Sequence, residues 1–312
     1  MHGEIYLRSV FGEGSEFGFT LSLPLANAED IPNIKRLQKT TSFSDFPQLK
    51  GHILLVEDIP TNQKVAASIL KKIGLSVVIA NDGLEAIELW KQHEFDLIFM
   101  DCLMPNMDGF EATQNIREQE AEGQRIPIIA LTATVIESEK HRCLQVGMDA
   151  VLPKPFKVHE LIKVLVGYLN DAAETLELVG PASIDAVEEV TTELADSNVI
   201  PSLDEETWQM MQEMLEEGFY ELLACFIEDA EKMFDELMLA MAEHQTQEVK
   251  RISHSIKSSS ANLGLLKLSE LAKGVEHQAE NDILNEAEIA AMCAEFSVVK
   301  PRLLITIKEQ GE

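Results

Sequence analysis

Residues 97–109 read LIFMDCLMPNMDG. The first four residues of this segment are apolar and predict a strand that is buried on both faces. Asp101 closes the strand, so its carboxylate is expected at the carboxyl end. In parallel α/β sheets, ligands gather at this end of the strands. The segment therefore predicts both a buried strand and the place of a functional site.

Four further short apolar runs lie on either side of that segment, and stretches of helical period separate them. They are Ile53–Val56, Val77–Ala80, Ile128–Leu131 and Ala150–Leu152. Pro60 suits the first turn of the helix that follows the first run, and Gly74 suits its end. Strands that alternate with helices predict a parallel sheet covered on both faces. We expect five strands in this sheet.

Polar residues close the predicted strands. Glu57 and Asp58 follow the first strand, Thr132 closes the fourth, and Lys154 comes after the fifth. Together with Asp101 this makes three carboxylates, and carboxylates brought together need a hard cation. Oxygen ligands with open positions are typical of Mg²⁺ rather than zinc. The residues therefore predict a magnesium site suited to phosphate chemistry.

These residues resemble the motifs of a known family. The matching segments are Glu57-Asp58, Met100-Asp101, Met104-Pro105-Asn106-Met107-Asp108-Gly109, Leu131-Thr132-Ala133 and Lys154-Pro155. They look like the receiver domain of response regulators over roughly residues 52–169, and we place this domain at 51–170. The resemblance implies an α/β fold with a flavodoxin-like, doubly wound, five-stranded parallel sheet.

The receiver resemblance also implies a role for each site residue, with Asp101 as the phosphoacceptor. The groups implied to hold Mg²⁺ all offer oxygen atoms: they are Glu57, Asp58, Asp101 and the backbone carbonyl of Leu103. Thr132 and Lys154 are implied to contact the phosphoryl oxygens, where a metal and an ammonium neutralise charge. Val151 stands where the family usually has an aromatic residue, so a switch that buries such a ring is not implied.

The C-terminal region, residues 203–310, has helical periodicity almost throughout. Its apolar stripes have spacings of three and four and include Met211, Met214, Leu215, Val249, Ile252 and Ile256. Such stripes predict an antiparallel helical bundle. Ser202 with Glu205 fits a capping box at the start of the first helix. Pro301 is expected to kink or interrupt the last helix.

His254 differs from the other histidines because Lys257 lies one turn later on the same helical face. It projects away from the apolar positions Ile252 and Ile256, so we expect it on the outer surface. Small serines on the next turn leave room for another protein. A neutral imidazole is available as a nucleophile near cytoplasmic pH.

The segment around His254 is similar to the His-x-x-Lys-Gly-Ser-Ser motif of histidine-phosphotransfer (Hpt) domains, and the resemblance covers roughly residues 203–308. It implies that His254 is the phosphorylated residue and that Lys257 is its electrostatic partner. Ser258 stands where the family has glycine, and serine is small enough to keep the surface open. The resemblance implies a passive nucleophile that borrows catalysis from a docked receiver.

A short N-terminal region and two linkers complete the predicted organisation. Residues 1–27 predict a β-hairpin and resemble the last strands of a histidine-kinase ATP-binding domain. Residues 28–50 and the acidic segment 171–202 have linker composition. A flexible tether of about thirty residues reaches roughly 30 Å, which gives an effective concentration on the order of millimolar. Transfer within one chain is therefore permitted, and transfer between chains stays open.

Composition argues against several functions. The formal net charge of −29 opposes an electrostatic grip on nucleic acid phosphates. The four cysteines lack metal-ligand spacing and suggest neither a zinc site nor a disulfide framework. No segment approaches the ~20 apolar residues that span a bilayer. We expect no nucleic acid partner, no direct membrane contact and a cytoplasmic location, with full-length relatives anchored in the membrane and this part in the cytoplasm.

The leading hypothesis is a multistep phosphorelay. An upstream histidine kinase core loads Asp101, which exchanges the phosphoryl group with His254. His254 then passes it to the receiver domain of a separate response regulator. These transfers are reversible, so the sequence leaves the net direction open. The segment that resembles a kinase ATP-binding domain does not include the asparagine-bearing helix, the ATP lid or the dimerisation helices. Autokinase activity is therefore not expected from this chain alone.

Two other classes of function compete with the relay. A phosphatase or phosphotransferase of the haloacid dehalogenase type also uses an aspartyl phosphate and Mg²⁺, but it requires Asp-x-Asp. The segment Asp101-Cys102-Leu103 lacks the second acid. A structural adaptor that binds partners without phosphate stays open, although it leaves the acidic pocket and the His254–Lys257 pair unexplained.

Overall fold

The computed structural model describes residues 3–10, 14–21, 47–121, 123–132, 137–155, 158–169 and 202–309. The chain divides into two compact units, Met1–Asp45 and Phe46–Glu312. In the first unit, β1 (Gly3–Val10) and β2 (Gly14–Leu21) pair as an antiparallel hairpin, which confirms that prediction. Almost all of the two predicted linkers lies outside the described residues.

A parallel sheet forms the centre of the first domain in the second unit. Its strands are β3 (His52–Val56), β4 (Ser76–Ala80), β5 (Leu97–Asp101), β6 (Ile128–Thr132) and β7 (Ala150–Pro153). The hydrogen-bonded order of the five strands is β4-β3-β5-β6-β7, and every pairing is parallel. This confirms the predicted doubly wound sheet. Because the strand order reverses between β3 and β5, the ligand crevice lies at their carboxyl ends.

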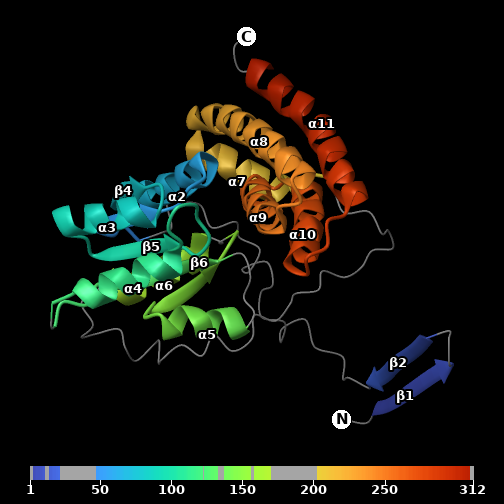
Figure 1. Ribbon diagram of the computed structural model, residues 1–312, viewed down its shortest axis with the longest axis horizontal. Coiled ribbons are helices and arrows are strands. Elements are labelled where there is room, and N and C mark those ends of the chain that lie inside the picture. The colour runs from blue at the N-terminus through green and yellow to red at the C-terminus, as the bar shows by residue number, and fades with distance from the viewer. Residues whose placement is uncertain are drawn as a thin grey trace, which may run out of the picture. The chain divides into compact units, whose positions relative to one another are not determined.

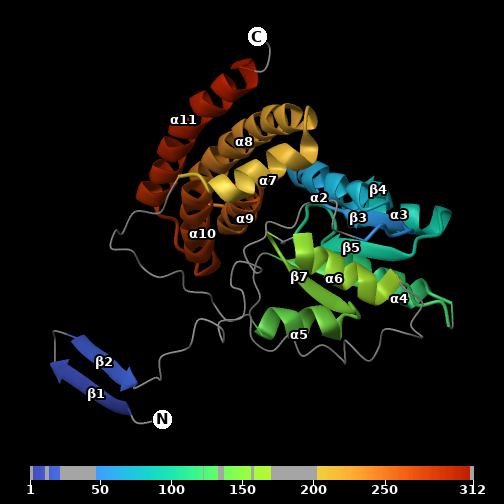
Figure 2. The same cartoon turned by 180° about the vertical axis from the view of Figure 1, so that it is seen from behind.

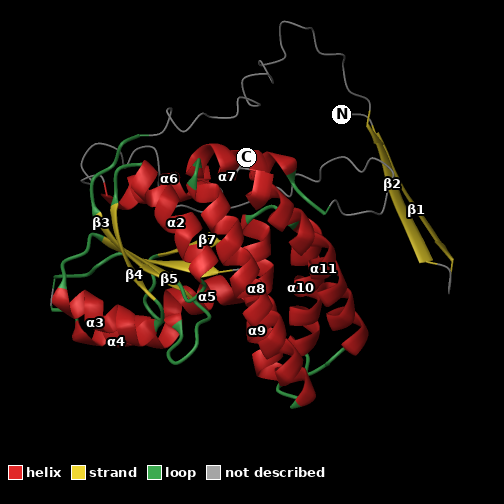
Figure 3. Ribbon diagram, turned by 90° about the horizontal axis from the view of Figure 1, so that it is seen from above, coloured by secondary structure: helices red, strands yellow, loops and turns green. Residues whose placement is uncertain are grey.

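Helices cover both faces of this sheet. They are α2 (Pro60–Lys72), α3 (Gly83–Gln92), α4 (Gly109–Gln119), α5 (Glu137–Gln145) and α6 (Val158–Leu169). Figure 3 shows α2 and α6 on one side of the sheet and α3 and α4 on the other. Leu54, Ile98 and Met100 pack with Phe110 and Ile116 in the core between the sheet and α4. Alternate strand residues point to the opposite face, so both layers are apolar.

The second domain is a helical bundle. Its helices are α7 (Glu205–Leu215), α8 (Gly218–Ala242), α9 (Thr246–Asn262), α10 (Leu266–Glu280) and α11 (Glu286–Glu309). Figures 1 and 2 show α8, α9, α10 and α11 side by side, and contacts between α8 and α11 close the bundle. Phe226, Ile252, Val275 and Met292 are buried, one from each of these helices. The predicted helical bundle is confirmed.

One local prediction for the bundle is wrong, and a second is wrong in part. The first helix is capped by Asp204, not Ser202, because the Asp204 carboxylate accepts a hydrogen bond from the Glu206 N–H. The carboxylate also accepts from the Thr207 hydroxyl, and the Asp204 backbone N–H donates to Gly264 O. The predicted interruption at Pro301 is wrong, because the last helix continues through this residue, and the alternative of a kink stays a prediction. Pro301 is exposed, so water can satisfy the backbone carbonyl that the missing N–H leaves free.

Candidate functional site

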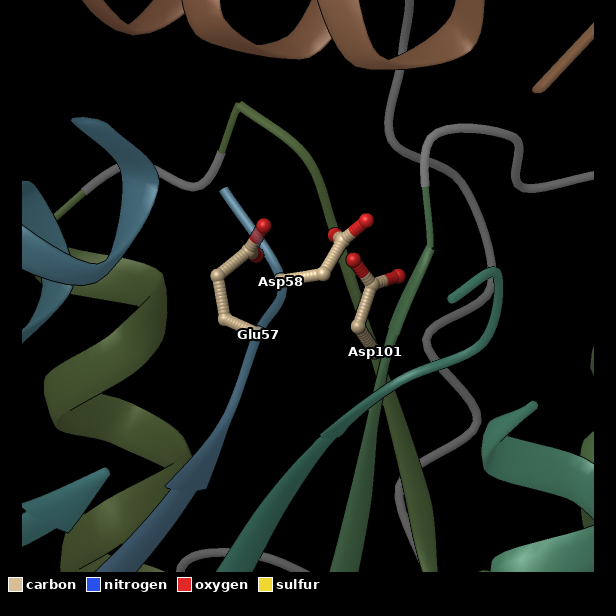
Figure 4. Close-up of side chains that lie close together, drawn as sticks. All are labelled: Glu57, Asp58 and Asp101. Atoms are coloured by element: carbon tan, nitrogen blue, oxygen red, sulfur yellow. The ribbon is translucent and has the colours of Figure 1, made fainter. Parts of the chain in front are cut away.

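Three carboxylates and one ammonium group meet at the carboxyl edge of the sheet. Figure 4 shows Glu57 and Asp58, which follow β3, beside Asp101 at the end of β5. One oxygen of each carboxylate lies within 4.8 Å of the others. The Lys154 Nζ, just after β7, forms ion pairs with Glu57 and, at 2.6 Å, with Asp101. The structure thus brings together four of the residues that the sequence placed at this edge.

The loop after β5 must pass very close to Asp101. A Cβ atom on Gly109 would lie 2.0 Å from the Asp101 backbone oxygen, so only glycine fits where α4 begins. The Gly109 N–H donates to Cys102 O at 3.3 Å, and the Leu103 N–H donates to Asp101 Oδ1 at 3.2 Å. The close approach of the backbone to Asp101 therefore explains why glycine follows Asp108 at the start of α4. The role of the Leu103 carbonyl stays a prediction.

The remaining predicted residues of this domain also lie in the last two strands or beside them. Thr132 ends β6 and is buried, next to the strand that leads to Lys154. Val151 lies in β7 and packs half-buried against the core that includes Met100. A small side chain therefore occupies the position where the receiver family usually has an aromatic residue.

Burial makes the charges of this pocket strongly interdependent. Burial, followed by the nearby charges of Asp101 and Glu57, raises the pKa of Asp58 to about 8. Burial and the charge of Asp101 also raise the pKa of Glu57, although Lys154 opposes this. Burial disfavours the charge of Lys154, but Asp101 and Glu57 outweigh it and raise the pKa of Lys154. One ammonium group therefore does not neutralise three carboxylates.

The pocket fits a cation of the magnesium type. Glu57 already accepts hydrogen bonds from Asn62 and Lys154. Asp58 Oδ1 is buried and finds no hydrogen-bond partner among the described residues. An orphaned carboxylate oxygen beside two other carboxylates suits an all-oxygen ligand set. Asp58 and Asp101, with support from Glu57, would hold such a cation.

In the helical bundle, His254 lies on α9 and is only 6% exposed. The prediction of an outer-surface position is therefore wrong. His254 Nδ1 lies 2.7 Å from Glu276 Oε1, and the second oxygen of Glu276 pairs with Lys257 Nζ. His254 and Lys257 are thus joined through one carboxylate of α10, rather than acting as an isolated pair.

The first domain covers the face of α9 that carries His254. Residues 254, 258 and 262 share one face because they are spaced by four. The Asn62 amide, on α2, donates to Ser258 Oγ at 3.3 Å, and the Asn262 amide donates to Asn62 Oδ1 at 2.9 Å. His254 lies one turn before Ser258, on the side of α9 opposite the apolar positions Ile252 and Ile256, and α2 contacts this side of the helix.

The charge of Glu276 fixes the state of the imidazole. Burial alone would raise the pKa of Glu276, but the hydrogen bond from His254 and the charge of Lys257 lower it. An ionised carboxylate can only accept, so His254 Nδ1 carries the donated proton. His254 Nε2 is buried without a hydrogen-bond partner in the described part of the chain. In this tautomer of the neutral imidazole the ring lone pair lies on Nε2.

Sequence reasoning missed three residues of this arrangement: Glu276, Asn62 and Asp229, a carboxylate on α8 that accepts hydrogen bonds from Thr61 of α2. Glu276 follows Leu268 and Ala272 at intervals of eight and four, so it lies at the edge of a buried helical stripe. That spacing is a weak signal that a carboxylate is buried. Nothing in the sequence marks Asn62 or Asp229, because their partners lie in the other domain.

Comparisons with known proteins identify the two domains that carry these residues. Residues 53–166 match the response regulator receiver domain family, and residues 221–300 match the Hpt domain family. The chain joins a receiver domain to an Hpt domain. This confirms the sequence-based recognition of a receiver domain followed by an Hpt domain, the arrangement predicted for the C-terminal part of a hybrid histidine kinase.

The relatives of this receiver–Hpt chain include large sensor proteins. It is 29% identical over 284 residues to the aerobic respiration control sensor protein ArcB of Escherichia coli (strain K12), covering 88% of this chain and 33% of that protein. It is 40% identical over 143 residues to Histidine kinase 3 of Arabidopsis thaliana, covering 39% of this chain and 14% of that protein. The chain thus spans a third or less of these relatives.

One similar solved structure is the receiver domain of a sensor histidine kinase from Pseudomonas aeruginosa PAO1, crystallised with a magnesium ion in its active site cleft. It is 43% identical, covers 39% of this chain and 99% of its own, and gives a TM-score of 0.37. Within the described ranges of the receiver–Hpt chain, none of the helices has the length and apolar character that crossing a bilayer requires.

Proposed function

We propose that Asp101 accepts a phosphoryl group and exchanges it with His254, which passes it to the receiver domain of a separate response regulator. The observation that carries this proposal is the Asn62 side chain. It donates to Glu57 Oε1 at 3.0 Å and to Ser258 Oγ at 3.3 Å, so one amide touches both the acidic pocket and the histidine helix. The two candidate sites therefore face a common contact.

The pocket supplies charge neutralisation for phosphoryl transfer. Lys154 Nζ, which pairs with Asp101, is placed to contact a phosphoryl oxygen once that carboxylate is phosphorylated. Thr132 ends the neighbouring strand and would contact a second oxygen. Glu57, Asp58, Asp101 and the carbonyl of Leu103 would hold Mg²⁺, which supplies Lewis-acid stabilisation of the phosphoryl charge when bound.

The second step transfers the group to nitrogen. The lone pair of His254 Nε2 attacks phosphorus, the bond from phosphorus to the Asp101 oxygen breaks, and Asp101 leaves as a carboxylate. The proton on Nδ1 stays hydrogen-bonded to Glu276, which stabilises the positive charge that develops on the ring. Lys257 pairs with the same carboxylate and would contact the phosphoryl group after transfer.

The partners follow from the two phosphoacceptors. We propose that an upstream histidine kinase core supplies the phosphoryl group and that a response regulator receiver accepts it from His254. Both partners of the relay act in the cytoplasm, so we place this chain there. Every step of the relay moves the phosphoryl group between an aspartate and a histidine, so transfer can also run in the reverse direction.

The proposal is tested with the wild-type chain, acetyl phosphate and Mg²⁺. Label on Asp101 is expected first, as an acyl phosphate that hydroxylamine removes. Acid-labile, base-stable label on His254 should follow it. Chelating the metal should suppress both. Histidine label that appears first and is insensitive to chelation would contradict the proposed order. Because small donors can label histidine directly, a phosphorylated receiver serves as the second donor.

The Glu276→Gln substitution should slow transfer from Asp101 to His254 by about 10-fold, because glutamine does not hold the Nδ1 proton with a full charge. The chain should also lose about 1–2 kcal/mol of stability near pH 7. The pKa of Glu276 is lowered from its ordinary 4.5, so its contribution is present above that value and is lost as pH falls through the lowered pKa.

Quenched transfer kinetics and denaturant unfolding at several pH values check this prediction. The exposed Glu270, on the same helix, gives the control variant Glu270→Gln, which should leave transfer within about twofold of wild type. Equal transfer rates for Glu276→Gln and the control would remove Glu276 from the mechanism.

A further inference from the structure

Helix α2 begins without a cap from its own segment. Its N-cap residue is Ile59, whose side chain has no oxygen, and its first residue is Pro60, which has no N–H. Thr61 therefore carries the first backbone donor of the helix. Helices normally satisfy such donors with a side chain close in sequence or with water, but Thr61 is fully buried.

The acceptor for Thr61 comes from the Hpt domain. Asp229 Oδ2, on α8, accepts the Thr61 backbone N–H at 3.0 Å and the Thr61 hydroxyl at 2.7 Å. Asp229 is itself only 9% exposed. A carboxylate at a helix N-terminus is favoured both by the free N–H groups and by the helix dipole. One domain thus caps a helix of the other.

The cap adjoins the contact that links the acidic pocket to the histidine helix. Asn62, the residue after Thr61, bonds Ser258 and Asn262 on the face of α9 that bears His254. The hydrogen bonds from Thr61 to Asp229 therefore set how α2 lies against α8. The hydrogen bonds of the Asn62 side chain set how α2 lies against α9. Together they fix the approach of Asp101 to His254.

Leaving a buried carboxylate without hydrogen-bond donors costs free energy. Asp229 therefore discriminates between receivers that supply these donors and receivers that do not. A receiver helix whose second residue lacks a hydroxyl leaves Asp229 with one donor fewer. A receiver with an acidic residue there brings two like charges together in a buried place. Both kinds of partner should dock poorly on this Hpt domain.

We propose that Asp229 is the residue by which the Hpt domain selects its receiver. It recognises a receiver helix that starts with an uncapped turn and a hydroxyl residue after proline, as in the chain's own receiver. The proposal rests on the phosphorelay function above and adds the determinant of partner choice. Asp229 acts by positioning the two domains and touches neither reacting atom.

The test uses the full chain and two readouts. The first is the rate of transfer from Asp101 to His254 after loading with acetyl phosphate and Mg²⁺, with the loading rate as the internal reference. The second is hydrogen exchange of the segment that contains Thr61, which needs no phosphate. Asp229→Asn should slow transfer about 10-fold relative to loading and should increase amide exchange at Thr61. The control is Asp235→Asn, an exposed aspartate on the same helix.

A charge-reversal pair tests selection directly. Thr61→Glu should slow transfer more than Asp229→Asn, although an acidic residue in the first turn favours α2 itself. Combining Thr61→Glu with Asp229→Lys should restore transfer to within about threefold of wild type, since the two charges then attract. This rescue is not expected if Asp229 only supports the fold of α8.

The outcomes separate this inference from the proposed function. If the wild-type chain loads Asp101 but never labels His254, the relay fails, while faster exchange at Thr61 in Asp229→Asn still supports the docking contact. If Asp229→Asn equals the Asp235→Asn control in both readouts, Asp229 does not select the receiver. Absence of rescue by the charge-reversed pair also overturns the selection.

Discussion

Asn in place of Asp101 should remove phosphoryl label from both sites of the chain at once. Asparagine has nearly the same shape as aspartate, but its amide cannot form an acyl phosphate. His254 has no other donor in the chain, so its label should fall to the slow rate at which acetyl phosphate phosphorylates histidine directly. The expected loss is roughly 1000-fold or more in the rate of labelling, because the nucleophile itself is removed. Timed labelling with acetyl phosphate and Mg²⁺ measures it.

The matched control for this variant is Asp96→Asn. Asp96 is an exposed aspartate directly before the amino end of β5, and its carboxylate accepts the His52 N–H, which asparagine can also do. Label should persist in this control. A phosphorylated separate receiver added to Asp101→Asn should still label His254, since that donor replaces the missing one. Full His254 labelling of the variant by acetyl phosphate alone would show that the two sites are not in series.

The receiver fold was predictable because each local signal agreed with the tertiary structure. The strand at residues 97–101 reads as a continuous apolar run, since both faces of a parallel sheet are buried. Pro60 and Gly74 stand where predicted, at the start of α2 and just after its end. The carboxyl edge is a property of topology, so residues that close separate strands had to meet there.

The surroundings of His254 were not predictable in the same way. Helical period places His254 opposite Ile252 correctly, but it identifies only the face that points away from the bundle core. Whether that face meets water or another domain depends on α2, which lies almost two hundred residues earlier in the chain. Burial of a polar helix face by a second domain leaves no mark in the periodicity of either segment.

The same reasoning explains why the supporting carboxylates were missed. Glu276 and Asp229 are two acidic residues in a chain with 54. Each is buried against a partner from another helix, His254 in one case and Thr61 in the other. An acidic residue on a helix usually faces solvent, so sequence pattern alone favours the wrong position for both.

The Asp58→Asn substitution should stabilise the receiver domain without metal while it inactivates the domain. The pKa of Asp58 rises from its ordinary 3.8 to about 8 on folding, so its charged form is disfavoured in the native state. Below pH 3.8 the Asp58 carboxyl is protonated in both the folded and the unfolded chain, so it does not destabilise the fold. As pH rises from 3.8 to about 8 the unfolded chain ionises more readily than the folded one, and the free energy of unfolding falls. Asparagine mimics the protonated form, so the variant should gain about 2 kcal/mol at pH 8 and almost nothing at pH 4.

Magnesium should reverse this ranking. A cation bound between Asp58 and Asp101 stabilises the wild type by about 2.7 kcal/mol when it is present at 100 times its dissociation constant. The variant lacks one ligand and should gain little, and its loading with acetyl phosphate should fall by roughly 100-fold. The chain has two tryptophans, and a Trp208→Phe background leaves Trp90 in α3 to report unfolding of the receiver domain alone. The uncompensated charge of the acidic pocket is what makes the cation bind there. The acidic pocket is therefore not the metal site if the metal-free variant is less stable than wild type at pH 8, or if Mg²⁺ stabilises both proteins equally.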